Sequence, residues 1–288
     1  MAIIPKHIVD SVVALGIKVN NDITWIGTGF LVGRKENQDK TKSTIYLITN
    51  RHVLQNQEKL WIRFNSNKTK VKDYSINLCT NGVQAYSAHS DADVVAISIN
   101  PGVLIDDESI FGFIDLDDAS LSVAKMAQTE VSEGNIVYAL GFPMNNVENN
   151  RKTPICRMGC ISRIANVEDN LMNFIIDAQV FPGNSGGPVI NRPEVLSITG
   201  TSCNSSANLI GIVCSYIPYR ESLQSTQTKE IISIHEENSG LTNVCPVDYI
   251  REVVEKEYSR VSQINRCRHT TAYSSWTWTH SPICVHTG

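Results

Sequence analysis

Short runs of apolar and β-branched residues, separated by turn-forming residues, recur along most of the 288-residue chain. Their length and composition are typical of strands rather than helices. The predicted strands cover residues 11–17, 23–32, 44–49, 59–64, 93–99, 135–141, 171–177 and 209–216. Polar insertions at 34–43, 147–153 and 192–207 are predicted to be surface loops. Regularly spaced short strands predict an all-β barrel architecture.

One segment, residues 246–260, departs from the strand pattern and predicts a helix. Pro246 suits the first position of a helix, and Asp248 would lie in its first turn. The apolar side chains of this segment recur at helical spacing, which places Val247, Ile250, Val253, Val254 and Tyr258 on one face. We expect this face to pack on the barrels and to have no chemical role.

The last residues, 261–288, have a different composition and are predicted to be a polar tail that is not a separate domain. They contain few aliphatic side chains and cannot form a core alone. Their potential metal ligands, Cys267, His269, His280, Cys284 and His286, do not have the spacing of a usual zinc site, so no metal is expected. The predicted organisation is one domain over 1–260 followed by this tail, which we expect to be dispensable for folding.

The composition of the chain is that of an ordinary globular protein. Hydrophobic residues make up 42% and charged residues 19%, enough to bury a core, and the net charge of −4 gives no indication of nucleic acid or an anionic membrane as a partner. The first 18 residues lack a clear signal-peptide cleavage site and are interpreted as the first strand. We therefore expect a cytoplasmic location, where most of the eight cysteines would be free thiols.

The strongest chemical signal is at residues 181–188, with the sequence FPGNSGGP. Glycines around Ser185 permit backbone angles that side chains forbid, and prolines stiffen both ends. Such a loop can present the Ser185 hydroxyl and direct the N–H groups of Gly183 and Ser185 to one point. Stabilising the oxyanion of acyl transfer requires this arrangement of donors. The alternative interpretation is a tight turn with a serine that has no role.

A nucleophilic serine needs a base and an acid that orients the base, and both are present upstream. His52 follows the apolar run 45–48, which places it just beyond a strand end. Asp93 directly precedes the apolar run 94–97. Asp91 competes for the same role, although adjacency to the strand favours Asp93. Considered singly, the histidine could be a surface residue and the aspartate a turn residue.

The order His52, Asp93, Ser185 resembles that of the trypsin-like (chymotrypsin-fold) serine proteases, and most closely their HtrA-like and bacterial trypsin-like branch. Other segments resemble that branch in the same order: GTGFLV at 27–32, TNRHV at 49–53, YALGFP at 138–143 and GCIS at 159–162. The resemblance covers roughly residues 8–256. It implies two six-stranded antiparallel barrels with a C-terminal helix. No peptide-binding PDZ domain fits in the remaining residues.

The resemblance also implies a mechanism without a cofactor. His52 would be the general base and Asp93 its orienting acid, and Ser185 would form an acyl-enzyme with a protein or peptide substrate. Cys214, Ser215 and Tyr216 would pair with the substrate, and Gln179 would lie at the base of the specificity pocket. Residues 217–241 are long enough to cover that region. Asn184 stands where digestive enzymes carry an aspartate that pairs with a freed N-terminus, so we expect activation without N-terminal cleavage.

The sequence allows two other interpretations besides a serine endopeptidase. The sequence GNSGG at 183–187 also fits the Gly-x-Ser-x-Gly motif of α/β-hydrolases, but it leads into a predicted strand instead of a helix, and the candidate acid and base lie upstream. That fold is therefore disfavoured. A catalytically inactive, protease-like peptide-binding module remains the alternative. The physiological substrate and any regulatory partner are not predicted from the sequence.

Overall fold

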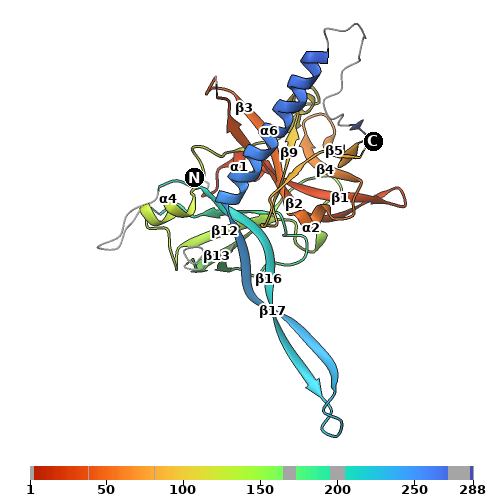
Figure 1. Cartoon of the computed structure of the whole chain (residues 1–288). Coiled ribbons are helices and arrows are strands. Elements are labelled where there is room, and N and C mark those ends of the chain that lie inside the picture. The colour runs from red at the N-terminus through yellow and green to blue at the C-terminus, as the bar shows by residue number, and fades with distance from the viewer. Residues whose placement is uncertain are drawn as a thin grey trace.

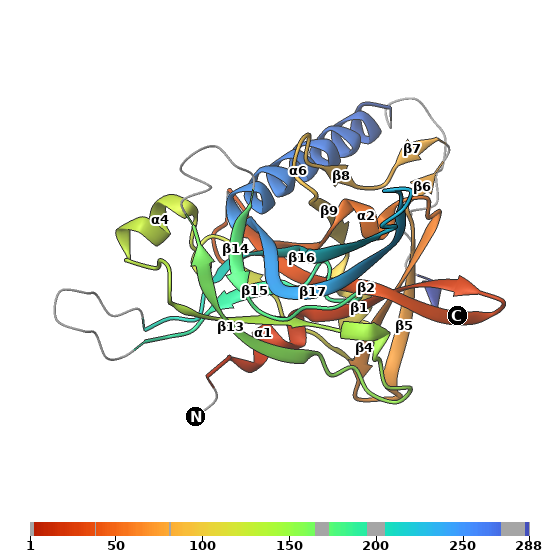
Figure 2. The ribbon, with the colours of Figure 1, turned by 90° about the horizontal axis from the view of Figure 1, so that it is seen from below.

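Two β structures, packed against each other and covered by one long helix, make up the protein (Figures 1 and 2). The computed structural model describes residues 3–37, 39–80, 82–164, 173–194, 205–271 and 286–287. Strands dominate this part of the chain, and the architecture is an all-β-dominated chymotrypsin-like fold with a C-terminal helix. The predicted fold class is confirmed at this level.

The N-terminal half forms one ten-stranded sheet, most of it in the order β18-β5-β4-β1-β2-β3-β9-β8, with β10 added beside β4 and β11 beside β2. Its strands are β1 (Val12–Val19), β2 (Asp22–Lys35), β3 (Ser43–Thr49), β4 (Lys59–Ser66), β5 (Lys70–Asn77), β8 (Ser87–Ala88), β9 (Val95–Ile99), β10 (Ser109–Ile110), β11 (Ile114–Asp115) and β18 (His286–Thr287). A separate small ribbon pairs β6 (Cys79–Thr80) with β7 (Val83–Gln84).

The C-terminal half closes into a six-stranded barrel in the order β12-β13-β14-β17-β16-β15. These strands are β12 (Ile136–Gly141), β13 (Ile155–Arg163), β14 (Phe174–Asp177), β15 (Pro188–Asn191), β16 (Leu209–Gln224) and β17 (Ile231–Pro246). Of the two barrels that the sequence predicts, this one is present as a closed ladder. The N-terminal sheet is not closed within the described residues, because its last strand, β8, has two residues and pairs only with β9.

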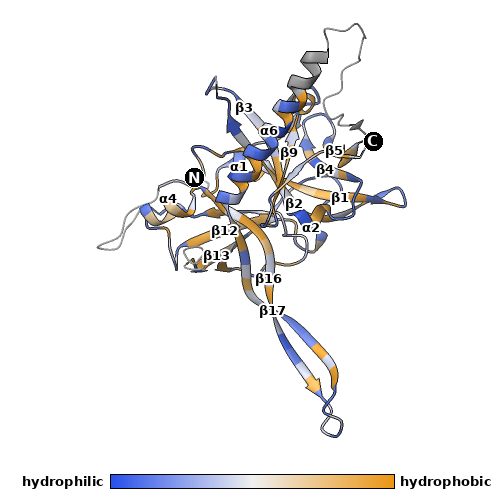
Figure 3. Cartoon of the chain, viewed as in Figure 1, coloured by the Kyte–Doolittle hydropathy of each residue, from blue (hydrophilic) through white to orange (hydrophobic). Residues whose placement is uncertain are grey.

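Alternating side chains of the central strands enter different hydrophobic cores. These strands are coloured largely as hydrophobic in Figure 3. On β3, Ile45 and Leu47 pack inside the N-terminal half, whereas Tyr46 and Ile48 face the core shared with the other half and with helix α6 (Val247–Thr271). A third core fills the C-terminal barrel. Burial on both faces explains why β3 reads as a continuous apolar run instead of an alternating one.

Helix α6 begins one residue after Pro246 and continues to Thr271, beyond the predicted end at residue 260. Its predicted apolar face is buried, with Val247, Ile250, Val253 and Val254 inaccessible to solvent. The helix runs along β9 and β8 (Figures 1 and 2). None of the helices in the described ranges is long and apolar enough to cross a membrane.

The first element is a short helix, α1 (Lys6–Ser11), which corrects the prediction that the chain begins with a strand. Pro5 precedes the helix, and the Ser11 hydroxyl donates to the carbonyl of Ile8 (2.7 Å). Ile8 is buried in the shared core. The apolar residues at 8–9 therefore pack through one turn of helix, and strand β1 starts only at Val12.

Lys152 is a buried cation in the segment that leads to β13, and it predicts a pH-dependent stability. Its side chain, with the residue only 2% exposed, donates to the carbonyl of Asp10 (2.9 Å). Burial lowers the pKa of Lys152 to about 8. The unfolded chain therefore binds more protons than the folded chain between pH 8 and pH 10.5, so this group makes the free energy of unfolding rise with pH in that window.

We expect the Lys152→Met variant to lack this rise. Between pH 7.5 and 10, the stability of the wild type should increase relative to that of the variant by about 2 kcal/mol, since one pKa unit corresponds to about 1.4 kcal/mol. Urea unfolding of both proteins across this range measures the difference. Parallel pH profiles would contradict the assignment of the buried charge to Lys152.

Candidate active site

The structure brings His52 and Asp93 into direct contact. Strand β3 ends at Thr49 and leads into the short helix α2 (Arg51–Leu54), which carries His52. The Nδ1 atom of His52 lies 2.6 Å from Oδ2 of Asp93, and the backbone N–H of His52 donates to Oδ1 of the same carboxylate (3.1 Å). Asp93 lies just before β9, which pairs with β3. Both carboxylate oxygens thus fix the position of the imidazole.

Two residues that the sequence analysis missed hold the loop that carries Asp93. The Nδ1 atom of His89 accepts the backbone N–H groups of Asp91 (3.2 Å) and Ala92 (2.9 Å), and its Nε2 contacts Glu252 of α6 (2.9 Å). The Arg51 guanidinium donates to the carbonyls of His89 and Ala92. The contacts of Arg51 and the contact of His89 with Glu252 have no local sequence pattern, because they join segments that are distant in the chain.

Asn50 supports the same loop from the buried side. Its Nδ2 donates to the backbone carbonyl of Asp93 (2.7 Å) and lies 3.7 Å from the sulfur of Cys214. Asn50 is completely buried, so this amide connects the end of β3, the aspartate loop and strand β16 in the interior. Asp91, the competing acid, instead accepts a hydrogen bond from its neighbour Ser90 (2.6 Å).

The loop with Ser185 is anchored to strand β2 through Thr28. The N–H of Thr28 donates to the carbonyl of Ser185 (2.9 Å), and its hydroxyl donates to the carbonyl of Gly183 (2.6 Å). Gly186 has φ +86°, and a Cβ there would lie 2.0 Å from the carbonyl oxygen of Thr28. The close approach therefore requires glycine at position 186.

Ser185 and His52 border the same part of the molecule, but no hydrogen bond joins them in the structure. A Cβ added at Gly27 would touch Val53, the neighbour of His52, at 2.9 Å and the carbonyl oxygen of Ser185 at 3.5 Å. The Ser185 hydroxyl donates to the carbonyl of Cys214 (3.3 Å). Attack on a substrate would require this hydroxyl to turn from Cys214 towards the imidazole.

The two N–H groups proposed for an oxyanion site, those of Gly183 and Ser185, have no acceptor among the described residues. Gly183 has φ +97°, and a Cβ there would lie 2.3 Å from the carbonyl oxygen of Phe142. The loop is closed by Asn184, whose side-chain Oδ1 accepts the N–H of Phe181 (3.1 Å). A neutral asparagine thus stabilises the loop locally, without an ion pair.

Cys214 is the extra residue of a bulge in β16, since Val213 pairs with Val244 and Ser215 pairs with Asn243. The bulge turns the Cys214 carbonyl towards Ser185 and leaves its thiol inside, next to that of Cys245. The hydrogen bond with the Cys214 side chain, together with burial, raises the pKa of the Cys245 thiol. Both thiols are free, as are Cys79, Cys156 and Cys160.

Of the predicted substrate-binding residues, Cys214 contacts Ser185 through its carbonyl, and Ser215 and Tyr216 follow it on β16. Gln179 is exposed in the segment between β14 and Ser185. The Ser215 hydroxyl accepts a hydrogen bond from Asn243 (3.2 Å), and the Tyr216 hydroxyl donates to Glu236 (2.8 Å). That last bond raises the pKa of Tyr216. Residues 217–241, expected to be able to cover this region, instead form most of a long hairpin that leaves the body (Figure 1).

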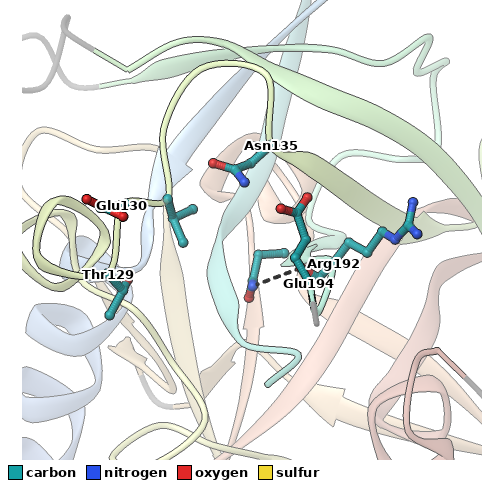
Figure 4. Close-up of a pocket in the computed structure, with 7 residues that line it drawn as sticks. Thr129, Glu130, Asn135, Arg192 and Glu194 are labelled. Atoms are coloured by element: carbon teal, nitrogen blue, oxygen red, sulfur yellow. Dashed lines mark hydrogen bonds between the residues drawn. The ribbon is translucent and has the colours of Figure 1, made fainter. Parts of the chain in front are cut away.

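Other features of the described chain do not add to the site. A small pocket is lined by Thr129, Glu130, Val131, Asn135, Asn191, Arg192 and Glu194 (Figure 4). It lies at the opposite end of β15 from Ser185. Within the described ranges, no three His, Cys, Asp or Glu side chains gather as metal ligands, and His280 and Cys284 fall outside those ranges.

The family model of the trypsin-like peptidase domain matches residues 27–196. The structure is similar to that of the MamO protease domain from Magnetospirillum magneticum in its apo form (TM-score 0.47, 13% identity, 85% of this chain and 96% of that chain). It is also similar to the inactive form of the Rv3671c protease (TM-score 0.42, 13% identity, 86% and 89% of the two chains). The search of curated proteins found no match.

Proposed function

The chain belongs to the trypsin-like peptidase domain family, and from this premise we propose that it is a serine endopeptidase with the triad His52, Asp93 and Ser185. The observation that carries the proposal is the double contact of Asp93 with the ring and the backbone of His52, beside the loop of Ser185. A histidine oriented in this way can act as a general base that accepts the proton of a nearby hydroxyl.

In the proposed reaction, the Nε2 atom of His52 takes the proton of Ser185 as its hydroxyl attacks a peptide carbonyl. Asp93 keeps the proton of neutral His52 on Nδ1 and stabilises the imidazolium that forms. The unpaired N–H groups of Gly183 and Ser185 would bind the oxyanion, a contribution worth about 10²–10³ in rate per donor. The protonated His52 then gives its proton to the leaving amine, and water hydrolyses the acyl-enzyme by the same steps. No metal or organic cofactor takes part.

The substrate is proposed to be a protein or peptide that pairs with Cys214, Ser215 and Tyr216. Gln179, proposed for the base of the specificity pocket, supplies no carboxylate for a lysine or arginine side chain. An uncharged residue before the scissile bond is therefore the preference that we propose. We assign catalysis to residues 1–260, and we keep 261–288 as a C-terminal extension without its own domain.

A second function is favoured by one specific contact. The Ser185 hydroxyl donates to the carbonyl of Cys214 and not to His52, which is the arrangement of a resting or inactive site. A protease-like module that binds peptides without cleaving them would need only the backbone groups of β16 that pair with the peptide and the N–H groups of Gly183 and Ser185. This alternative makes a distinct prediction, since its serine would not be activated.

Labelling by a fluorophosphonate probe separates the two functions. The probe reacts only with a serine that has an activated hydroxyl, so we expect covalent labelling of the native protein at Ser185, located by peptide mass spectrometry. Heat-denatured protein and the Ser185→Ala variant are the controls, and neither should be labelled. Absence of labelling in all conditions, including with added unfolded protein, would favour the binding module.

A further inference from the structure

Strands β16 and β17 continue far beyond the barrel as a two-stranded hairpin, which we call the arm (residues 217–240) (Figure 1). Strand β15 pairs with β16 only between Leu209 and Ile212. Beyond that point, no strand in the described chain lies along the outer edge of β16. In an antiparallel ladder, every second residue turns its N–H and C=O groups outward, so this edge offers a row of unpaired hydrogen-bonding groups.

This free edge begins at the candidate active site. Cys214 directs its carbonyl to Ser185, and the same strand continues through Tyr216 into the arm. Where the two strands leave the barrel, β16 lies on the side nearer α2, the helix with His52, and the strands cross further along the arm (Figure 1). From Pro218 to Leu223, β16 pairs with β17 residue by residue without a bulge. The edge is therefore a regular template that leads away from the serine.

The arm carries apolar residues along both of its strands (Figure 3), and their side chains are exposed. Leu223 is 61% and Ile234 63% exposed. Leu223 and Tyr219 share one face, because they are four residues apart on a strand, whereas Ile234 lies opposite Ser222 on the other face. A partner that covers a single face would leave half of these side chains in water. A strand added to the edge places its own side chains beside both faces.

We infer that the outer edge of β16 in the arm binds an extended segment of the substrate that lies N-terminal to the cleaved bond. This inference rests on the proposed function, because the continuity with Ser185 identifies the occupant as substrate. The segment would add a third antiparallel strand to the arm. The preferred substrates are unfolded polypeptides with an apolar residue at alternate positions, packed beside Tyr219 and Leu223. A two-stranded ribbon is marginally stable alone, so a third strand also stabilises the arm.

Variants that change the arm but not the triad test this inference. In the shortened variant, Asn-Gly joins Pro218 directly to Asn238, which are paired in the ladder. The double variant Tyr219→Thr/Leu223→Thr changes the edge strand, and Ile234→Thr on β17 is the matched control. Each is also made with Ser185→Ala for binding measurements. The binding probe is fluorescent α-casein, a chain without a stable fold, and its affinity is measured by polarisation.

We expect the Ser185→Ala protein with an intact arm to bind casein at least about tenfold more tightly than the shortened form. Binding by the double variant should fall in the same direction, and Ile234→Thr, on the strand that does not border the added segment, should reduce it less than the double variant does. Among proteins with Ser185, two peptides that span one mapped casein cleavage site are compared. The value of kcat/KM should be higher for the peptide with ten residues before the cleaved bond than for the peptide with four. In the protein with the shortened arm, the two peptides should have similar kcat/KM values.

Equal casein binding with and without the arm would overturn the inference. So would a change from dimer to monomer on shortening without any change in casein binding, which would assign the edge to a second copy of the chain. Failure of the proposed function appears separately, as absence of fluorophosphonate labelling at Ser185. Arm variants with Ser185 should be labelled as well as the wild type, because none of them alters the triad.

Discussion

Replacing Ser185 with alanine should remove peptidase activity and leave the fold intact. The Ser185 side chain makes one hydrogen bond, to the carbonyl of Cys214, and its loss should change the free energy of unfolding by about 1 kcal/mol or less. Without the nucleophile no acyl-enzyme forms, so kcat should fall by about 10⁴-fold or more. Rates of casein hydrolysis and urea unfolding followed by circular dichroism measure the two quantities.

Asp93→Asn should reduce kcat by about 10⁴-fold, because an amide holds the opposite tautomer of His52 and cannot stabilise the imidazolium. His52→Ala should have an effect of similar size. The matched control is Asp91→Asn, two residues away, whose carboxylate contacts only the exposed Ser90 hydroxyl. Its activity should remain within about twofold of the wild type, since an exposed acid far from the imidazole changes kcat little. An inactive Asp91→Asn with an active Asp93→Asn would show that the acid is assigned to the wrong residue.

The candidate triad could be identified from the sequence because each member has a local signal. His52 and Asp93 lie beside apolar runs that are buried as β3 and β9, and Ser185 lies among glycines that a close approach to Thr28 requires. Strand ends and glycine-rich turns are properties of short segments. The order of His52, Asp93 and Ser185 along the chain then indicated a resemblance to the trypsin-like serine proteases. The match to the trypsin-like peptidase domain family confirms this membership.

The supporting contacts had no such signal. Arg51 and His89 hold the loop of Asp93 through backbone groups, and Asn50 reaches Asp93 and Cys214 from the end of another strand. The contacts of Arg51 and Asn50 join distant segments, so they depend on how the strands pack and on the bulge at Cys214. The orientation of the Ser185 hydroxyl towards Cys214 is likewise a property of the folded chain.

The arm was not predicted as a hairpin for a different reason. Strand prediction relies on an alternation that arises when one face is buried, and here both faces of residues 218–236 meet solvent. The predicted helix ended too early for a related reason. Beyond Arg260 the apolar side chains of the helix are less buried, because Val261 is half-buried and Ile264 is exposed. Polar segments can continue regular structure that a buried segment has started.

Helix α6 supports the aspartate side of the site through one buried carboxylate, Glu257, which predicts a large effect on stability. Glu257 is inaccessible to solvent and accepts two hydrogen bonds from Arg260 (2.7 and 2.6 Å). It also accepts the hydroxyl of Ser87 in β8 (2.7 Å) and the N–H of Ser98 in β9 (3.3 Å). These contacts fix the helix to the two strands on either side of the Asp93 loop.

Glu257→Ala should lower the free energy of unfolding by about 3–5 kcal/mol, because it leaves a buried hydroxyl and a partly buried guanidinium without their main partner. Urea unfolding followed by circular dichroism measures the change. The matched control is Glu255→Ala in the same helix. Glu255 also pairs with an arginine, the buried Arg34 (2.6 Å), but the Glu255 side chain is 59% exposed. Arg34 also keeps its hydrogen bonds to the carbonyl of Lys35 and the side chain of Asn37, so the expected loss is smaller, about 1–2 kcal/mol. Equal losses in the two variants would show that burial of Glu257 does not determine its contribution.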